Sequence, residues 1–345
     1  MKKGCLWTVL SLFLVFCVLS SGFAQQAPER PKNLKLTILG MQVGTSIQYR
    51  AELFAEALRK AYPDWSVRAV ATVKGPADVL THRSKKSVEF FVGLMPWGQE
   101  KAAFGPLYKK RGIDFEKDFA WTGVIPSSTK YIHCIVKADT GITSLKDMID
   151  KKAKIKVGLS RPSHEGMFRM LTGFYGASFE DIEGWGGKIL SVNFGTPVGP
   201  ESLREGKIDM GFAWTGLPNP PFLQAAADLK LRLLPIAPEP GLLKKSEFME
   251  YYRAVIPANA YPFNPEDVIT TAATEWLSHV PGTVSEDVVY YVTKGIMSQK
   301  NFLAGSYPEF ASVMTPEYIA KAVAQLKNPV DPGALRFYRE AGYVK

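Results

Sequence analysis

The chain has 345 residues and a formal net charge of +9 at pH 7; 46% of its residues are hydrophobic and 22% are charged. A chain of this length can form one large domain or two lobes of ordinary size. Its charges are scattered, without a basic tail or a run of arginines, which argues against nucleic acid as a partner.

The first 24 residues have the pattern of a secretory signal peptide, with a basic start, an apolar run over residues 6–19 and small residues at 22 and 24 before the cleavage site. The apolar run is too short for a comfortable transmembrane helix. Cleavage after Ala24 leaves 321 residues with a net charge of +7. We therefore expect a soluble, exported protein that begins with a flexible leader at residues 25–35.

Residues 36–62 form the first predicted structural unit. An apolar strand at 36–39 is followed by a Gly-Thr-Ser loop and then by apolar residues at helical spacing up to Pro63. Thr45 or Ser46 can cap the helix. The free N–H groups and the positive end of the helix dipole favour an anionic or strongly polar guest at the loop. An ordinary capped strand-to-helix turn is the alternative.

Strands alternate with helices along most of the remaining chain, which predicts an α/β fold with mainly parallel sheets flanked by helices. In such sheets ligands lie beyond the carboxyl ends of the strands. Two polar or glycine-rich loops occupy that place in each half, so we expect a ligand between two lobes. The predicted strands include 67–73, 88–94, 119–125, 131–137, 155–158, 189–193, 208–214 and 231–236, and the loops are 44–46, 74–78, 159–165 and 214–219.

The residues that can carry chemistry do not form a catalytic or cofactor motif. There is no Walker loop, dinucleotide fingerprint or nucleophile elbow, and the histidines never occur at His-Xaa-Xaa-His spacing, so we expect no enzyme activity, cofactor or metal. Cys134, the one cysteine left after cleavage, has apolar neighbours that indicate a buried, inert thiol. Ser163-His164-Glu165 keeps a serine hydrolase as an alternative to a polar helix start.

Several segments, in their order and spacing, resemble the TAXI-type solute receptors of TRAP transporters over roughly residues 36–300. These segments are Gly40-Met-Gln-Val-Gly-Thr-Ser-Ile-Gln-Tyr49, Thr72-Val-Lys-Gly-Pro-Ala-Asp78, Ala138-Asp-Thr-Gly-Ile-Thr-Ser-Leu-Lys-Asp147, Lys156-Val-Gly-Leu-Ser160, Gly206-Lys-Ile-Asp209, Thr215-Gly-Leu-Pro218, Ile256-Pro-Ala-Asn-Ala-Tyr261 and Glu286-Asp-Val-Val-Tyr290.

The resemblance implies a periplasmic binding protein of type II, in which two lobes close on a small carboxylate-bearing molecule such as an organic acid or amino acid. The receptor would pass its ligand to the membrane subunits of a TRAP-type permease and would catalyse nothing itself. On this pattern, residues 36–128 and 233–345 form the first lobe, and residues 129–232 form the second.

In the first lobe, the expected ligand contacts lie on three strand-end loops. Gly44 and Thr45 offer hydrogen bonds at the first helix, although Thr45 can also serve as a cap alone. Tyr49 could close over a ligand or simply pack. The last three candidates are Gly75 and Ala77, as backbone donors or plain turn residues, and Trp97, as aromatic lining or core.

In the second lobe, the most polar candidate wall follows the strand at 155–158. Arg161 could pair with a carboxylate or lie exposed, and His164 could act as a neutral donor or a solvated cap. Trp214 could line the cleft, with an apolar or aromatic ligand body against it, or belong to the core. The remaining candidates are Ser160, Ser163, Thr215 and Gly216.

Two other interpretations stay open at this stage. The protein could serve a tripartite tricarboxylate system or present its ligand to a sensor kinase, with the same two-lobed fold. It could also be a secreted hydrolase that uses Ser160 or Ser163 as its nucleophile.

Overall fold

The computed structural model describes residues 29–41, 43, 45–72, 88–94, 109, 121–160, 163–236, 239, 241, 251–326 and 328–345. The segment with the signal-peptide pattern lies outside these residues. Within them, every helix is too short or too polar to cross a membrane. Residues from Lys32 onward form one compact unit.

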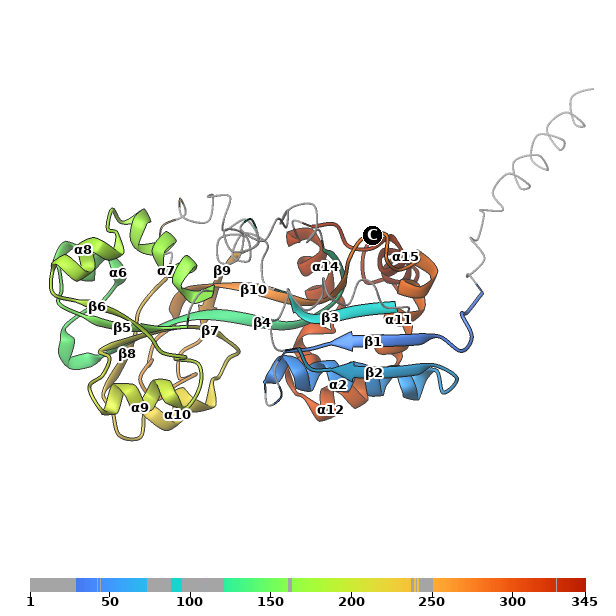
Figure 1. The fold of residues 1–345 in the computed structure, drawn as a ribbon, viewed down its shortest axis with the longest axis horizontal. Coiled ribbons are helices and arrows are strands. Elements are labelled where there is room, and N and C mark those ends of the chain that lie inside the picture. The colour runs from blue at the N-terminus through green and yellow to red at the C-terminus, as the bar shows by residue number, and fades with distance from the viewer. Residues whose placement is uncertain are drawn as a thin grey trace, which may run out of the picture. The chain divides into compact units, whose positions relative to one another are not determined.

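The described strands form one mixed sheet in the order β2-β1-β3-β10-β4-β7-β5-β6, with β8 beside β4 and β9 beside β10 (Figure 1). The triplets β2-β1-β3 and β7-β5-β6 are parallel, as expected from the alternation of strands and helices, whereas β4 and β10 pair with antiparallel neighbours. The predicted α/β class is confirmed. The strands are β1 Lys35–Leu39, β2 Ser66–Val70, β3 Val88–Leu94, β4 Thr122–Lys137, β5 Lys156–Leu159, β6 Lys188–Ser191, β7 Met210–Thr215, β8 Leu231–Leu233, β9 Tyr252–Ile256 and β10 Val268–His279.

The two longest strands, β4 and β10, pair with each other at the centre of the sheet. The sequence analysis predicted two separate strands, at 119–125 and 131–137. Instead β4 continues through residues 126–130, and Pro126 pairs with Trp276 where the register shifts. Proline is tolerated at such irregularities because the ladder hydrogen bond is already lost there.

The first hydrophobic core contains residues of β1 and β3, of the start of β4 and of the end of β10. These strands pack against α2 and the C-terminal helices. Helix α2 packs on β1, β2 and β3, and α11 packs on α2 and α15. We call this part the first lobe. Its helices are α2 Ser46–Ala61, α11 Glu286–Ser298, α12 Lys300–Ser306, α13 Glu309–Val313, α14 Pro316–Gln325 and α15 Pro332–Glu340.

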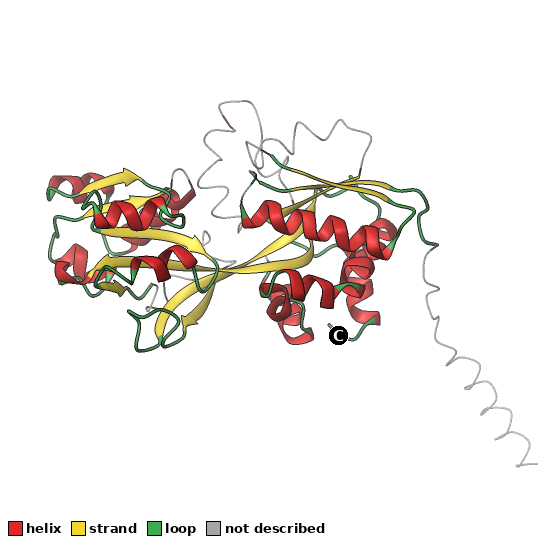
Figure 2. Ribbon diagram, turned by 90° about the horizontal axis from the view of Figure 1, so that it is seen from below, coloured by secondary structure: helices red, strands yellow, loops and turns green. Residues whose placement is uncertain are grey.

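The other half of the sheet has a core on each face, and we call this part the second lobe. Helices flank this half of the sheet (Figure 2). Because side chains alternate along a strand, Ile132 and Cys134 face the second core while Ile135 faces the third. Helices α6, α7 and α8 cover the second core, and α9 and α10 cover the third. Their bounds are α6 Leu145–Asp150, α7 Ser163–Phe174, α8 Phe179–Gly184, α9 Val198–Arg204 and α10 Pro220–Ala225, and a short 3-10 turn, η1, spans Ala138–Thr140.

The second lobe extends further along the chain than the expected boundary after residue 232. Leu234, Ile236 and Tyr251 pack in the second core, and Ile256 and Tyr261 pack in the third. The chain therefore returns to the first lobe along β10, and residues 256–261, which precede that strand, belong to the second lobe. Cys134 lies in the second core, where burial raises the pKa of its thiol, as expected for an inert cysteine.

Candidate functional site

The carboxyl ends of β5 and β7 meet at one edge of the sheet in the second lobe. The two strands are parallel, with Leu159 paired to Phe212, so the loop after β5 and the end of β7 lie next to each other. Helix α7 begins at this edge, and the N–H of His164 donates to the carbonyl of Ser160 at 3.1 Å. The first turn of a twelve-residue helix is thus directed to the strand ends.

Four buried polar atoms near this edge have no hydrogen-bond partner among the described residues. They are Ser160 Oγ, His164 Nδ1, Trp214 Nε1 and Thr271 Oγ1, and we call these four residues the unpartnered patch. A buried polar atom without a partner costs about 1–3 kcal/mol. Native proteins have few such atoms, so a group of them indicates a place where a guest completes the hydrogen bonds.

The register of three neighbouring strands explains why Trp214 and Thr271 share one face of the sheet. Trp214 on β7 pairs with Ile132 on β4, and Ala272 on β10 pairs with Tyr131. Thr271 is therefore the neighbour of Ile132 on the other side, and the three side chains point toward the second core. Helix α7 covers the same core through Met167 and Phe168, which brings His164 to that face.

The unpartnered patch carries no formal charge. Burial lowers the pKa of His164 to about 4, and a hydrogen bond to the backbone of Phe212 only partly opposes this shift. Its ring is therefore neutral at pH 7. The His164 residue is 8% exposed and the Trp214 residue 7%. The indole N–H can only donate, and the hydroxyls can donate, so the patch favours a guest rich in acceptors.

The other predicted residues of the second lobe have different environments. Thr215 faces away from the patch, and its hydroxyl accepts a hydrogen bond from Asn219 Nδ2 at 3.0 Å, which holds the loop after β7. A Cβ added to Gly216 would lie 3.9 Å from both Lys130 Nζ and Glu309 Oε2. Arg161 lies outside the described residues, as does the side chain of Ser163, the first residue of α7.

In the first lobe, two of the predicted residues are described. Thr45 is the N-cap of α2, and its side chain accepts from the N–H of Gln48 at 3.2 Å. Tyr49 is 44% exposed; its hydroxyl donates to the carbonyl of Ser306 at 3.3 Å, and its ring packs edge-on against Tyr307. Gly44, Gly75, Ala77 and Trp97 lie outside the described residues.

The sequence did not point to Thr271 or Gln48. Thr271 lies on β10, and only the strand register places it across β4 from Trp214, on the same face of the sheet. Gln48 follows the cap of α2; its Nε2 donates to Glu52 Oε1 at 3.0 Å, while its buried Oε1 has no partner among the described residues. Gln48 lies close to Gly40, the residue after β1, where an added Cβ would be 2.2 Å from Oε1.

A charged network occupies the centre of the sheet, where β4 pairs with β10. Arg50 of α2 donates to Glu275 Oε2 at 2.5 Å and to Ser127 Oγ at 2.9 Å, and Lys130 Nζ lies 3.6 Å from the same Glu275 oxygen. Burial would raise the pKa of Glu275, but the two cations outweigh it and lower that pKa. Nearby, Glu309 Oε1 accepts from Ser128 Oγ at 2.8 Å. These groups are bonded to one another.

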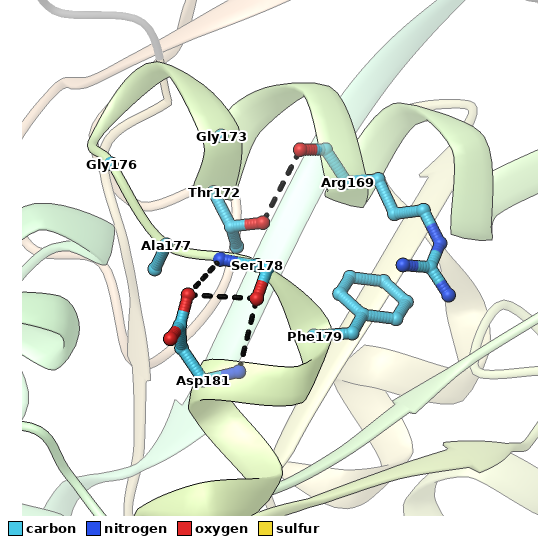
Figure 3. Close-up of a pocket in the computed structure, with 8 residues that line it drawn as sticks. All are labelled: Arg169, Thr172, Gly173, Gly176, Ala177, Ser178, Phe179 and Asp181. Atoms are coloured by element: carbon cyan, nitrogen blue, oxygen red, sulfur yellow. Dashed lines mark hydrogen bonds between the residues drawn. The ribbon is translucent and has the colours of Figure 1, made fainter.

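A surface cavity of about 420 Å³ lies between the end of α7 and the start of α8 (Figure 3). Its polar atoms are already engaged: Ser178 and Asp181 form a capping box, and the hydroxyl of Thr172 donates to the carbonyl of Arg169. The guanidinium of Arg169 stacks 3.7 Å from the ring centroid of Phe179. Since no residue that lines this cavity has an unpartnered buried polar atom, we do not assign the ligand site to it.

The arrangement of Ser160 and His164 does not resemble a nucleophile and its base. Ser160 Oγ and His164 Nδ1 both lack partners among the described residues, so they do not bond to each other. A serine nucleophile needs a base within hydrogen-bond reach. The described geometry therefore gives the hydrolase alternative no support.

Comparison with solved structures gave similar chains of the same approximate length. A TctC solute-binding protein from Polaromonas has 17% identity and a TM-score of 0.47, and the match covers 92% of this chain and 97% of that one. MatC from Rhodopseudomonas palustris with bound malate has 12% identity and a TM-score of 0.46, covering 89% and 98%. The periplasmic binding protein BugD has 15% identity and a TM-score of 0.45, covering 92% and 100%.

A family model described as the NMT1-like family matches residues 56–342. This match spans most of the sequence, including the whole of the unpartnered patch and Lys130 and Glu275 of the charged network, whereas Arg50 and the first ten residues of α2 lie before it. The chain therefore belongs to the NMT1-like family.

Proposed function

We propose that this chain is a periplasmic solute-binding receptor that captures a small carboxylate-bearing molecule and delivers it to a TRAP-type membrane permease, without catalysis of its own. The observation that carries the proposal is the unpartnered patch, in which four buried polar atoms from α7, β7, β10 and the loop after β5 lack partners among the described residues. The signal-peptide pattern of residues 1–24 supports an exported protein.

The chemistry of the unpartnered patch suits a carboxylate. Trp214 Nε1–H and the hydroxyls of Ser160 and Thr271 can donate to its oxygens, and the first turn of α7 adds N–H groups and the positive end of its dipole. Neutral donors can hold an anion because each bond to a charged acceptor is stronger than a neutral one. The apolar neighbours Ile132 and Met167 favour a ligand with an apolar or aromatic body.

The central strands offer a means of closure. β4 and β10 both run from the first core to the cores of the second lobe, so a bend in these two strands would change the angle between the lobes. Hinge closure of this kind is how periplasmic binding proteins enclose their ligands. The network of Arg50, Lys130 and Glu275 at the same place would fix the strands about which the lobes move.

The transport partner is the finer part of the proposal and rests on the ordered sequence motifs. A gene for a TRAP-type permease beside the gene for this protein would support it. A tricarboxylate permease or a sensor kinase in that position would change the partner and leave the receptor role in place.

Thermal-shift measurements on the purified mature protein test the receptor role. We expect at least one organic acid or amino acid to raise the melting temperature, and Trp214→Phe to weaken the effect. Trp185→Phe, the same change at the C-cap of α8 and outside the unpartnered patch, should preserve it. A folded protein that no carboxylate stabilises would contradict the proposal.

A further inference from the structure

We infer that the ligand is an α-amino acid, whose carboxylate pairs with Lys130 and whose ammonium group pairs with Glu309 in the space above Gly216. This inference rests on the proposed function and names the class of ligand at the same site. It extends the site toward the first lobe by two charged side chains that the sequence analysis did not single out.

The space above Gly216 is bordered by two groups of opposite charge. Gly216 directly follows β7, and a Cβ added to it would lie 3.9 Å from Lys130 Nζ and 3.9 Å from Glu309 Oε2. No other atom of the described residues beyond its chain neighbours lies within 4 Å of that point. The ammonium and the carboxylate form no ion pair with each other among the described contacts. They therefore border room for ligand atoms.

Lys130 is a buried cation with an incomplete set of partners. The residue is 7% exposed, and Glu275 Oε2 lies 3.6 Å from its Nζ, beyond hydrogen-bond distance. Nζ makes no hydrogen bond to any of the described residues. Arg50 already donates to the same Glu275 oxygen, so two cations share one carboxylate. Because buried charges are stable when they are paired and hydrogen-bonded, an anionic ligand group would complete the surroundings of Lys130.

Glu309 is held in place by the strand that it faces. Its Oε1 accepts from Ser128 Oγ at 2.8 Å and from the N–H of Thr129 at 2.9 Å. The hydroxyl of Tyr307 also interacts with this carboxylate. Since a carboxylate can accept about four hydrogen bonds, Glu309 keeps the capacity to accept from a ligand ammonium group.

The strand register places Lys130 on the same face of the sheet as the unpartnered patch. Ile132 pairs with Trp214, and both pack in the second core. Lys130 precedes Ile132 by two residues on β4, so both side chains lie on that face, about 7 Å apart. Ala273, which pairs with Lys130, packs in the same core. The carboxylate of an amino acid above Gly216 can therefore lie between Lys130 and the donors of the patch.

Both charges of an amino acid are needed to complete this arrangement. An acid without the amino group leaves Glu309 facing the ligand carboxylate with no cation between them. An amino acid amide leaves Lys130 without an anion. Since hydrogen bonds to charged groups are the stronger ones, each omission should weaken binding by about 10- to 150-fold.

Calorimetric titration of the mature protein with matched compounds tests this inference. One set is leucine, 4-methylpentanoate and leucinamide, and a second is phenylalanine, 3-phenylpropanoate and phenylalaninamide. The third set is glutamate, glutarate and the α-amide of glutamate. In each set that binds, we expect the amino acid to bind about 10- to 150-fold more tightly than either analogue.

Two variants assign the two preferences to the two side chains. Lys130→Met keeps the aliphatic part of the side chain and should lower the preference over the amide, while the preference over the acid without an amino group remains. Glu309→Gln should have the converse effect. Glu317→Gln, at an exposed position in the first turn of α14, is the matched control and should change neither ratio.

A third variant tests the space itself without removing a charge. The backbone of Gly216 has no positive φ, and the methyl group of Gly216→Ala would make ordinary contacts at 3.9 Å, so we expect the urea unfolding curve to stay unchanged. The methyl group would occupy the room assigned to the ligand, and amino acid affinity should fall about tenfold or more. This variant keeps the inference testable if Lys130→Met does not fold.

The outcomes separate this inference from the proposed function. If acids without an amino group bind as tightly as the amino acids, or if Glu309→Gln and Lys130→Met leave both ratios unchanged, the amino acid assignment is overturned while the receptor function stands. Undiminished binding to Gly216→Ala also overturns it. Failure of every acid and amino acid to bind contradicts the carboxylate receptor itself, and the inference falls with it.

Discussion

Two buried histidines of the second lobe, His133 and His164, lie on opposite faces of the same sheet. They differ in how many of their ring nitrogens have hydrogen-bond partners. Burial lowers the pKa of both His133 and His164 to about 4. His133 uses both nitrogens, with Nδ1 3.1 Å from the carbonyl of Tyr131 and Nε2 2.9 Å from the hydroxyl of Tyr261. His164 leaves Nδ1 without a partner among the described residues.

The comparison shows that burial and a shifted pKa do not by themselves mark a functional histidine. The Tyr261 hydroxyl that bonds to His133 also accepts from the N–H of Asn219 at 2.9 Å, so the His133 ring belongs to a hydrogen-bonded network, in which the buried Oδ1 of Asn219 alone has no partner among the described residues. The face with His164 keeps unpaired polar atoms in four residues. We therefore assign stability to the network of His133, Tyr261 and Asn219 and ligand binding to the unpartnered patch, and the following experiments test this division.

The largest expected effect is at the charged network of Arg50, Lys130 and Glu275. Replacement of Glu275 by glutamine removes the only carboxylate within 4 Å of Arg50 and Lys130 among the described residues and leaves two buried cations without their counter-charge. We expect the free energy of unfolding in urea to fall by about 3–5 kcal/mol. Glu286→Gln, at an exposed position in the first turn of α11, is the control and should change it by less than about 0.5 kcal/mol. Equal effects of the two changes would contradict the assignment.

The next effect is a dependence of stability on pH. Both histidines have a folded-state pKa of about 4, below the ordinary 6.5, so between these values the unfolded chain binds protons that the folded chain does not. The free energy of unfolding should therefore be highest above pH 6.5 and fall as the pH is lowered to 4, by up to about 3 kcal/mol for each histidine.

A variant isolates the contribution of one histidine to this slope. Glu275, whose pKa is lowered from 4.5, adds to the loss of stability in the acid range, so the raw curve is a sum. The difference between the unmodified protein and His164→Phe should show one proton fewer taken up on unfolding between pH 6.5 and 4. Parallel curves would mean that His164 is not buried as a neutral ring.

A smaller effect separates the two histidines directly. His133→Leu removes the acceptor of the Tyr261 hydroxyl, and we expect it to lower the free energy of unfolding by about 2–3 kcal/mol. His164→Phe removes the contact of the ring with the backbone of Phe212 and an Nδ1 atom that has no partner among the described residues, so we expect a smaller loss, of about 0.5–1.5 kcal/mol. Urea denaturation at pH 7.5 measures both, and a reversal of the order would remove the basis of the comparison.

Much of the fold could be predicted from the sequence, because strand and helix patterns depend on local periodicity. The alternation of strands and helices gave the α/β class, and the caps at Thr45 and Ser144 follow local rules. The continuity of β4 could not be predicted. Residues 126–130 are polar and begin with proline, and only their pairing with β10 makes them a strand.

The residues of the candidate site that stand at the ends of strands could be predicted from the sequence. The residue that joins the site through the pairing register of the strands could not. Ser160, His164 and Trp214 stand at the ends of β5 and β7 or just after them, so a sequence reading reaches them. Thr271 joins them only because β10 lies beside β4. The pattern of used and unused hydrogen bonds, which separates Thr215 from Trp214 and His133 from His164, depends on the folded arrangement alone.

The most direct test of the account is a parallel measurement of affinity and stability in Trp214→Phe and Thr271→Val. For a carboxylate that binds the unmodified protein, the account predicts that each change weakens calorimetric affinity about tenfold or more, while the free energy of unfolding without ligand changes by less than about 1 kcal/mol. Saturable binding that neither change weakens would contradict the claim that the unpartnered patch holds the ligand.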